Sequence, residues 1–357
     1  MRVGRTLVVL GLAALASSPA SAMFRAADLV VVPTAASTPG LQNSNWRTDL
    51  EIMNVDTVPI DVSISLLRCC NPTDGVTWFQ DIKNTLGGRT SDGFGHIDNK
   101  LADIQPGHAV QIDDVVTANW GSNLKGALLV FAYEAGTLMT TTPPGGNPKL
   151  IVVNARTYSL GTDGLGNPTT YGTQVPGLPW HDYIDPGKQS EGFNKVVFTG
   201  LREDASYRTA IGLVNISDRL TTLDVSLTLN AGDGTQISQQ FVRLYPLVQD
   251  QYDQAIINLF GKTLADAISG ATLTVTVASY TSGSQTPAPA LMAYVTRMDN
   301  ATNDPVYIEQ TFTKGFPWDC IFNGNCTAAA ASLAVPAVPR GTAPHLRPPT
   351  PAGRLTR

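Results

Sequence analysis

The sequence predicts an all-β protein built from two tandem antiparallel β-sandwich domains, Ig-like or jelly-roll-like, each with one short helix. Three observations predict this fold class. A set of sequence blocks occurs twice in the same order, apolar and polar residues alternate with a period of two inside the blocks, and Gly-containing pairs such as Asp233-Gly234 mark turns between them. Half-buried strands of this kind pair antiparallel in most proteins.

Residues 1–22 have the order of a secretory signal peptide. Arg2 and Arg5 precede an apolar run, and Ala20-Ser21-Ala22 has the form of an A-x-A cleavage site. We therefore expect a secreted protein that is extracellular, periplasmic or at the cell surface. The apolar run is too short to span a bilayer and no later stretch is longer, so we expect no transmembrane segment.

The formal net charge of the whole chain is −5, but the central part of the chain is more acidic than this value suggests. Without Arg2 and Arg5 of the signal-like segment 1–22 and the four arginines of the C-terminal segment 327–357, the chain has 18 basic and 29 acidic residues. Because nucleic-acid binding depends on clustered Lys and Arg, we expect no nucleic-acid partner.

The repeat is clearest in two nine-residue blocks, 46–54 and 207–215. Both have an aromatic residue, then Arg-Thr, then alternating residues that end in Asn; the recurring residues are Trp46, Arg47, Asn54, Tyr207, Arg208 and Asn215. Ile60–Leu66 then matches Leu223–Leu229, and Gln111–Gly121 matches Gln251–Gly261 without a gap. Order and spacing together indicate a duplication.

The repeat sets the expected domain organisation. The first sandwich domain covers 28–178 and includes an insertion, 68–100, where the second copy has only a short turn. A Pro- and Gly-containing linker, 179–192, leads to the second domain, 193–313. A cysteine loop, 314–326, and a tail, 327–357, follow; the tail holds six prolines and four arginines, so we expect it to be disordered.

The blocks also predict the environment of their residues. In the first copy Thr48, Leu50 and Ile52 fall on one side of a strand and Arg47 and Asp49 on the other. We expect Trp46 and Tyr207 to anchor the cores and Asn54 and Asn215 to form turns. Arg47 and Arg208 are expected to form a structural pair inside each domain, with a ligand groove as the alternative. Helical spacing is confined to 112–120 and 252–260.

The four cysteines fall into two pairs. Cys320 and Cys326 enclose an Asn-Gly turn, which predicts a disulfide in an exported protein. The adjacent Cys69 and Cys70 are free, bonded to each other, or paired elsewhere, and the sequence leaves these alternatives open. The spacing contains no CxxC, which disfavours a four-thiolate zinc site.

No motif names an enzymatic chemistry. The chain has no G-x-S-x-G and no H-E-x-x-H, and its four histidines do not recur between the copies. We assign no catalytic residue, although a carboxylate pair of the glycosidase type would leave no local signature.

Two sets of residues are candidates for binding. The insertion carries Trp78, Phe79 and Phe94, which we expect to bind a ligand or else to cover the end of the sandwich. One loop places several oxygen ligands together, as calcium requires: Asp299, Asn300, Asn303 and Asp304. Asx turns between strands are the favoured reading of that loop, and no other cofactor is expected.

The strand block Trp46–Asn54, followed far downstream by Ala293-Tyr294-Val295 and Asp299–Pro305, resembles a group of uncharacterised exported bacterial proteins with tandem β-sandwich repeat domains. The resemblance implies extracellular placement and supplies no activity or catalytic residue. The first copy lacks the Tyr-Val-x-x-x-Asp-Asn pattern, so an ion site built on it would exist once.

We therefore expect a non-enzymatic secreted or cell-surface binding or scaffold protein whose partner is an extracellular protein or a glycan. The alternative is a secreted carbohydrate-active protein, either a glycan-binding module or a weak glycoside hydrolase.

Overall fold

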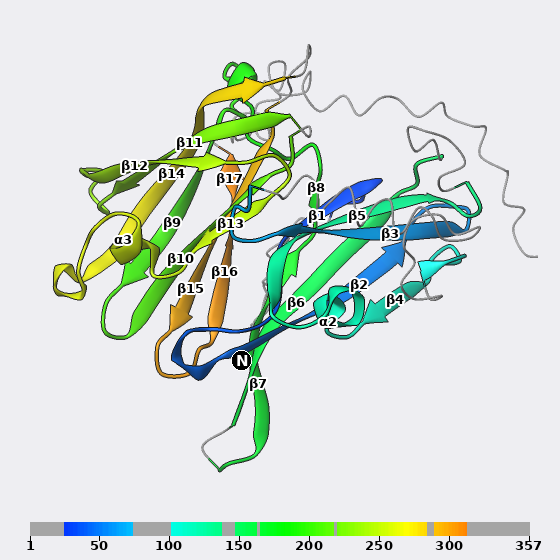
Figure 1. The fold of residues 1–357 in the computed structure, drawn as a ribbon, viewed down its shortest axis with the longest axis horizontal. Helices are drawn as coiled ribbons and strands as arrows, with labels where there is room; N and C mark the ends of the chain where they lie inside the picture. The colour runs from blue at the N-terminus through cyan, green and yellow to red at the C-terminus, as the bar shows by residue number, and fades with distance from the viewer. Residues whose placement is uncertain are drawn as a thin grey trace, which may run out of the picture. The chain divides into compact units, whose positions relative to one another are not determined.

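Antiparallel strands dominate the computed structural model (Figure 1). The structure describes residues 25–73, 101–137, 147–162, 165–217, 220–283 and 289–312, all within the first of two compact units, 1–313. The leader, the aromatics Trp78, Phe79 and Phe94, the pair Cys320 and Cys326, and the tail lie outside the described residues.

The elements of residues 25–179, called the first half below, are strands with one short α-helix and one 3-10 turn. They are β1 (Leu29–Pro39), η1 (Leu41–Asn43), β2 (Asn45–Asn54), β3 (Ile60–Arg68), β4 (Ala109–Ile112), α2 (Val115–Trp120), β5 (Leu124–Glu134), β6 (Ile151–Thr162), β7 (Pro168–Pro176) and β8 (Leu178–Pro179).

The second half, residues 186–312, has a similar series. Its elements are η3 (Pro186–Lys188), β9 (Lys195–Glu203), β10 (Tyr207–Asn215), β11 (Thr221–Asn230), β12 (Gln236–Leu244), β13 (Gln249–Tyr252), α3 (Ala255–Asn258), η4 (Leu264–Asp266), β14 (Ile268–Ser282), β15 (Leu291–Asp299), β16 (Pro305–Glu309) and β17 (Thr311–Phe312).

The two halves pair their strands in the same way. β4-β2-β6-β7 corresponds to β13-β10-β15-β16, and β3-β5-β1 corresponds to β11-β14-β9. In the first half the two groups join into one eight-stranded sheet, because the end of β1 leaves β5 and pairs with β2 through Thr38 and Pro39. In the second half they are separate sheets of four and five strands. The predicted all-β class of β-sandwich type is confirmed.

Each half buries its own apolar cluster between its strand groups. The first includes Leu50, Ile52 and Val130, and the second includes Ile211, Leu213 and Leu273. A third cluster draws residues from both halves, among them Val31, Leu129, Val214 and Met292. The halves are therefore packed against each other through apolar side chains as well as joined by the chain.

Left-handed backbone recurs at matched positions of the repeat. Asp114 and Gln254, which precede the two short helices, have φ angles of 42° and 49°. Gly107 and Leu247 also match, at 75° and 54°. Residues other than glycine adopt this region at a cost, so its recurrence at Gln254 and Leu247 indicates a backbone that the duplication preserved.

Buried asparagines make the same hydrogen bonds in both halves. The Asn54 amide nitrogen donates to the carbonyls of Val58 and Ile104 at 2.9 and 2.8 Å, and its Oδ1 accepts from the Asp56 N–H. Asn215 repeats this arrangement with the three matched backbone groups of the second half. Each asparagine therefore connects the turn after its own strand, β2 or β10, to the segment that precedes the edge strand β4 or β13.

No helix among the described residues is long and apolar enough to cross a bilayer.

Replacing Asn215 with Ala removes an amide that is 0% exposed and satisfies three carbonyl groups. Because buried acceptors left without a donor cost about 1 to 3 kcal/mol each, we expect the free energy of unfolding to fall by about 3 kcal/mol. Denaturant unfolding monitored by circular dichroism measures the change. The control is Gln236→Ala at an exposed site of β12; equal effects of the two substitutions would contradict the role given to Asn215.

Candidate functional site

A pocket lies where the two halves meet. Its volume is about 90 Å³. The first half contributes β1, the η1 turn, β2, β5, β6 and β7, and the second half contributes β10, β13, β15 and β16. The lining residues used below are Thr34, Thr38, Trp46, Lys125, Thr157, Thr173, Arg208, Gln251, Asp253, Tyr294, Thr296 and Met298.

Tyr294 forms the buried centre of this junction. Its ring crosses β10 at Gly212, where a Cβ atom would overlap the ring. The hydroxyl accepts from Gln249 Nε2 at 2.6 Å and donates to Gln251 Oε1 at 2.9 Å. Burial raises the pKa of Tyr294, and Thr34 of the first half acts in the opposite direction. The phenol therefore remains neutral and hydrogen-bonded at the junction of the halves.

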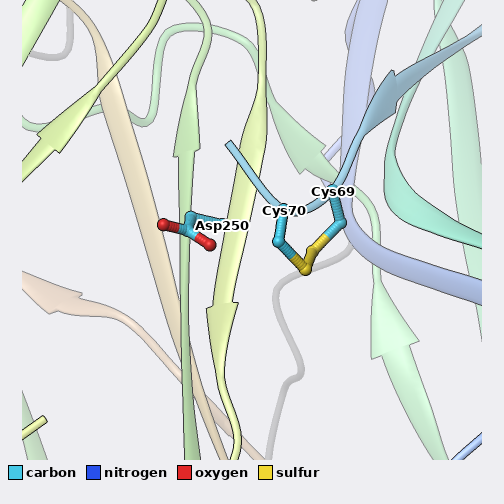
Figure 2. A group of neighbouring side chains, drawn as sticks. All are labelled: Cys69, Cys70 and Asp250. Atoms are coloured by element: carbon cyan, nitrogen blue, oxygen red, sulfur yellow. A yellow bond between two sulfur atoms is a disulfide. The ribbon is translucent and has the colours of Figure 1, made fainter. Parts of the chain in front are cut away.

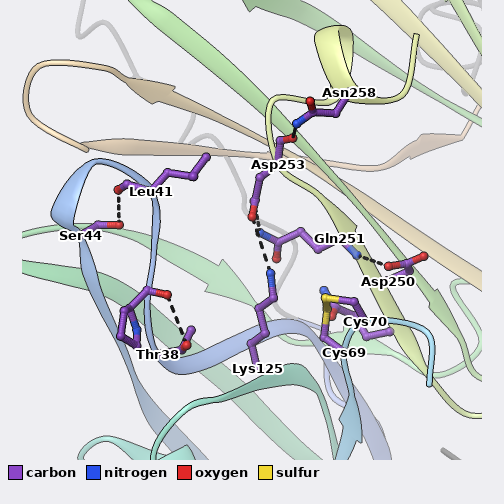
Figure 3. Close-up of polar contacts among 12 residues, drawn as sticks. Thr38, Leu41, Ser44, Cys69, Cys70, Lys125, Asp250, Gln251, Asp253 and Asn258 are labelled. Atoms are coloured by element: carbon purple, nitrogen blue, oxygen red, sulfur yellow. Dashed lines mark hydrogen bonds and ion pairs between the residues drawn. A yellow bond between two sulfur atoms is a disulfide. The ribbon is translucent and has the colours of Figure 1, made fainter. Parts of the chain in front are cut away.

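From Gln251, the acceptor of the Tyr294 hydroxyl, polar contacts continue to Asp253 in the pocket; Figure 3 shows the part from Gln251 onward. Gln251 Nε2 donates to Asp253 Oδ1 at 2.6 Å, and Lys125 Nζ of the first half lies 3.6 Å from Asp253 Oδ2. Asn258 donates to the Asp253 carbonyl. The carboxylate is therefore held in place by its own half and paired with a cation from the other half.

Arg208 supplies the second cation of the pocket. Its side chain is 2% exposed, and its guanidinium donates to the side-chain oxygens of Asn300 at 3.0 Å and Asn303 at 2.6 Å. Burial lowers the pKa of Arg208, while nearby carboxylates raise it, Asp253 first among them. The positive charge is stabilised by amide oxygens of the loop that follows β15.

The same loop is the one predicted to bind calcium. Asp299 Oδ1 accepts from the N–H groups of Ala301 and Thr302, and these backbone bonds lower the pKa of Asp299. The bonds to Asp299 are those of an Asx turn, and Asn300 and Asn303 accept from Arg208. The loop thus has the interactions expected for Asx turns between strands. Asp304 lies exposed after it. The calcium site stays a prediction, since a guanidinium already faces two of its four proposed ligands.

The matched arginine of the first copy has a different partner. Arg47 Nε lies 3.0 Å from Asp114 Oδ2, and Arg47 also donates to Asn45 Oδ1. Arg47 thus forms an ion pair within its half, whereas Arg208 faces the pocket.

Trp46 and Tyr207 do not enter the cores expected for them. Both are half-buried, and neither belongs to the buried clusters. Trp46 lines the pocket, and Tyr207 lies 4.2 Å from the guanidinium of Arg202 in a cation–π contact. Trp46 is the second residue of β2 and Tyr207 is the first residue of β10, so both lie at the end of a strand and outside the buried clusters.

Cys69 and Cys70 are bonded to each other in the structure. They follow β3 and lie beside Asp250 on the edge strand β13 (Figure 2). The next residue, Asn71, donates its N–H to the Gln249 carbonyl at 3.0 Å and accepts from the Tyr245 N–H. The segment therefore covers part of the free edge of a sheet that belongs to the other half.

Glu203 is a buried carboxylate outside the pocket. Its side chain is 1% exposed, and Oε2 accepts from the Ile256 N–H of α3 at 3.1 Å. Burial raises the pKa of Glu203 to about 7, against the lowering effect of the backbone bonds from Ile256 and Thr209 and of Arg208. The arrangement anchors the short helix α3 to β9.

Sequence reasoning missed the junction, but the alignment of the copies holds a signal for it. The outward-facing residues Asp49, Glu51 and Met53 of β2 correspond to Ala210, Gly212 and Val214 of β10. Charged or exposed residues have become small or apolar, and β10 is buried on both faces except at its first residue. This change indicates that something covers the second copy's outer face.

No protein-family model matches the chain, and no curated protein matches it. Among solved structures, the chain was compared with one described as the M60 catalytic domain with the CBM51-1 and CBM51-2 domains from Clostridium perfringens ZmpB. The two are 9% identical with a TM-score of 0.14, and the match covers 74% of this chain and 32% of that one. So weak a likeness says nothing about fold or function.

Gly212→Ala places a Cβ atom where the Tyr294 ring crosses the strand. Because both are held in a packed junction, we expect the free energy of unfolding to fall by about 1 to 3 kcal/mol. Gly283→Ala is the matched control, since its Cβ would make only an ordinary contact with Leu220 at 3.5 Å. Urea unfolding of both variants measures the difference, and an unaffected Gly212→Ala protein would contradict the crossing.

Glu203 makes stability depend on pH. The folded-state pKa of about 7 lies above the ordinary value of 4.5, so the folded chain binds more protons between those pH values. This contribution is fully present below pH 4.5 and is lost as the pH rises through 7, on the order of 3 kcal/mol in total. Glu203→Gln keeps a side-chain acceptor but cannot ionise. We therefore expect it to remove the part of the decrease in unfolding free energy with rising pH that Glu203 causes.

Unfolding free energies measured across this pH range for the wild type, Glu203→Gln and the exposed control Glu51→Gln test the assignment. If Glu203→Gln keeps the wild-type pH profile, another group is responsible.

Proposed function

We propose that the chain is an exported, non-enzymatic binding or scaffold protein and that its ligand site is the pocket at the junction of the two halves. The observation that carries the proposal is the joint lining of this pocket: Trp46 and Lys125 come from one half, Arg208 and Asp253 from the other. A site of this composition exists only when both copies are packed together.

The charged groups of the pocket are arranged for recognition. Asp253 is paired with Lys125 and receives a hydrogen bond from Gln251, while Arg208 is held by two asparagine oxygens. A ligand group entering the pocket meets fixed dipoles and paired charges, which favour binding and orientation. Export is proposed from the leader-like order of residues 1–22.

The volume limits what the pocket takes. The volume of about 90 Å³ is several times what one water molecule needs, so the site has room for one end group of a larger ligand. Two cations against one carboxylate line it, which favours a polar or anionic end group. The remainder of the ligand would lie on the surface around Leu41, which is 43% exposed.

Glycan binding is the second candidate, and one feature of the pocket favours it. Trp46 lines the pocket together with five threonines: Thr34, Thr38, Thr157, Thr173 and Thr296. An aromatic ring with an apolar face beside short hydroxyl groups matches the mixed surface of a sugar ring.

Trp46→Ala tests the pocket as a binding site. The full chain is screened on arrays of glycans and of extracellular proteins, and the affinity for any hit is then measured by calorimetry. We expect the substitution to weaken binding by at least about tenfold, because truncating a central aromatic commonly costs more than 1 to 2 kcal/mol. Trp180→Ala, at a tryptophan that is 43% exposed and outside the pocket lining, is expected to bind as the wild type does.

Equal binding by Trp46→Ala and the wild type would reject the pocket. A parallel screen for turnover of polysaccharides, esters and peptides tests the other part of the proposal, since turnover by the wild-type chain would reject a non-enzymatic role.

A further inference from the structure

Three side chains that bind metal ions in other proteins meet away from the pocket. The ligand atoms of Cys69, Cys70 and Asp250 all lie within 4.8 Å of one another (Figure 2). Cys70 is exposed, Cys69 is half-buried and Asp250 is 7% exposed. The cluster therefore joins an accessible sulfur pair from the first half to a buried carboxylate from the second.

Backbone hydrogen bonds on both sides of the cysteine pair hold this segment against the two halves. The Cys69 N–H donates to the Lys125 carbonyl at 2.9 Å, and on the other side the Asn71 N–H donates to the Gln249 carbonyl at 3.0 Å. Asn71 also bonds the backbone of Arg243 and Tyr245. None of these hydrogen bonds involves a sulfur atom, and together they place the cysteine segment beside Asp250.

Asp250 has acceptor capacity to spare. Its Oδ1 accepts from the Gln251 N–H and its Oδ2 accepts from the Tyr252 hydroxyl at 2.6 Å. A carboxylate offers about four lone-pair positions, so each oxygen retains one. The two existing bonds fix the orientation of the carboxylate, as hydrogen bonds to metal ligands do in other proteins.

We propose that the reduced pair Cys69 and Cys70, together with Asp250, binds one thiophilic divalent cation such as Zn²⁺ or Cd²⁺. Thiolates select such ions, and two sulfurs with one carboxylate oxygen leave a fourth position for water in a tetrahedral site. Two sulfurs bound to one Zn²⁺ at about 2.3 Å stand roughly 3.7 Å apart, so metal binding requires the sulfur–sulfur bond to open. This site goes beyond the proposed binding function and does not depend on it.

The reaction has two balanced steps. A low-molecular-weight thiol or phosphine reductant transfers two electrons to the disulfide; with a thiol, two molecules become one external disulfide, and the two cysteine sulfurs gain two protons. The cation then forms two metal–sulfur bonds and one metal–oxygen bond, and the two thiol protons pass to solvent. Oxidation of the pair by a disulfide reverses the first step and releases the cation.

The experiment is a Cd²⁺ titration of the full chain, followed by the sulfur-to-cadmium charge-transfer absorption. All samples carry Cys320→Ser and Cys326→Ser, so that the absorption reports Cys69 and Cys70. We expect one Cd²⁺ per chain after reduction and removal of the reductant, and no signal from the oxidised chain. Asp250→Asn is expected to weaken binding by at least about tenfold, while Asp233→Asn, in an exposed turn of the same half, leaves it unchanged.

X-ray absorption of the Zn²⁺-loaded reduced chain gives a readout that needs no Asp250 variant. Two sulfur and two lighter neighbours are expected. Absence of cation binding by the reduced chain, equal affinity in Asp250→Asn, or a shell without sulfur would each overturn the proposal.

Discussion

The packing of the two halves depends on one buried phenol. Tyr294 reaches over Gly212 to hydrogen-bond two glutamines of β13, and Thr34 of the first half lines the same pocket and affects the pKa of the phenol. A tyrosine hydroxyl buried without partners would cost several kcal/mol, so this network is what allows the ring to occupy the junction. The apolar contacts of Val31, Val214 and Met292 surround it. The pocket and the cysteine cluster exist because the halves meet in this way.

Duplication explains why the same motif serves two purposes. Thr48 and Thr209 accept from matched N–H groups of β1 and β9, and the two asparagines close matched turns. These residues face inward and keep their partners. Outward-facing residues have different partners in the two copies. Arg47 pairs with Asp114 in its own half, whereas Arg208 donates to Asn300 on a surface that the other half covers.

The sequence was sufficient to predict the strand-rich class, the repeat and the inward residues other than Trp46 and Tyr207, because an alternating pattern reports which face of a strand meets its core. It was not sufficient for the junction, since alternation does not say what covers the opposite face. The replacement of Glu51 by Gly212 across the copies was the available signal. The loop at Asp299 was equally ambiguous, because amide oxygens that suit calcium suit a guanidinium as well. The insertion with Trp78 and Phe79 lies outside the residues the structure describes.

The central claim is that the two halves share a buried polar contact, and a double-mutant cycle between them tests it most directly. Thr34→Val and Tyr294→Phe each remove one side of the contact across the junction. Residues in contact show coupling of about 0.5 to 3 kcal/mol in the free energy of unfolding, and the account predicts a value in that range for this pair. Additivity within about 0.3 kcal/mol would mean that the side chains do not meet.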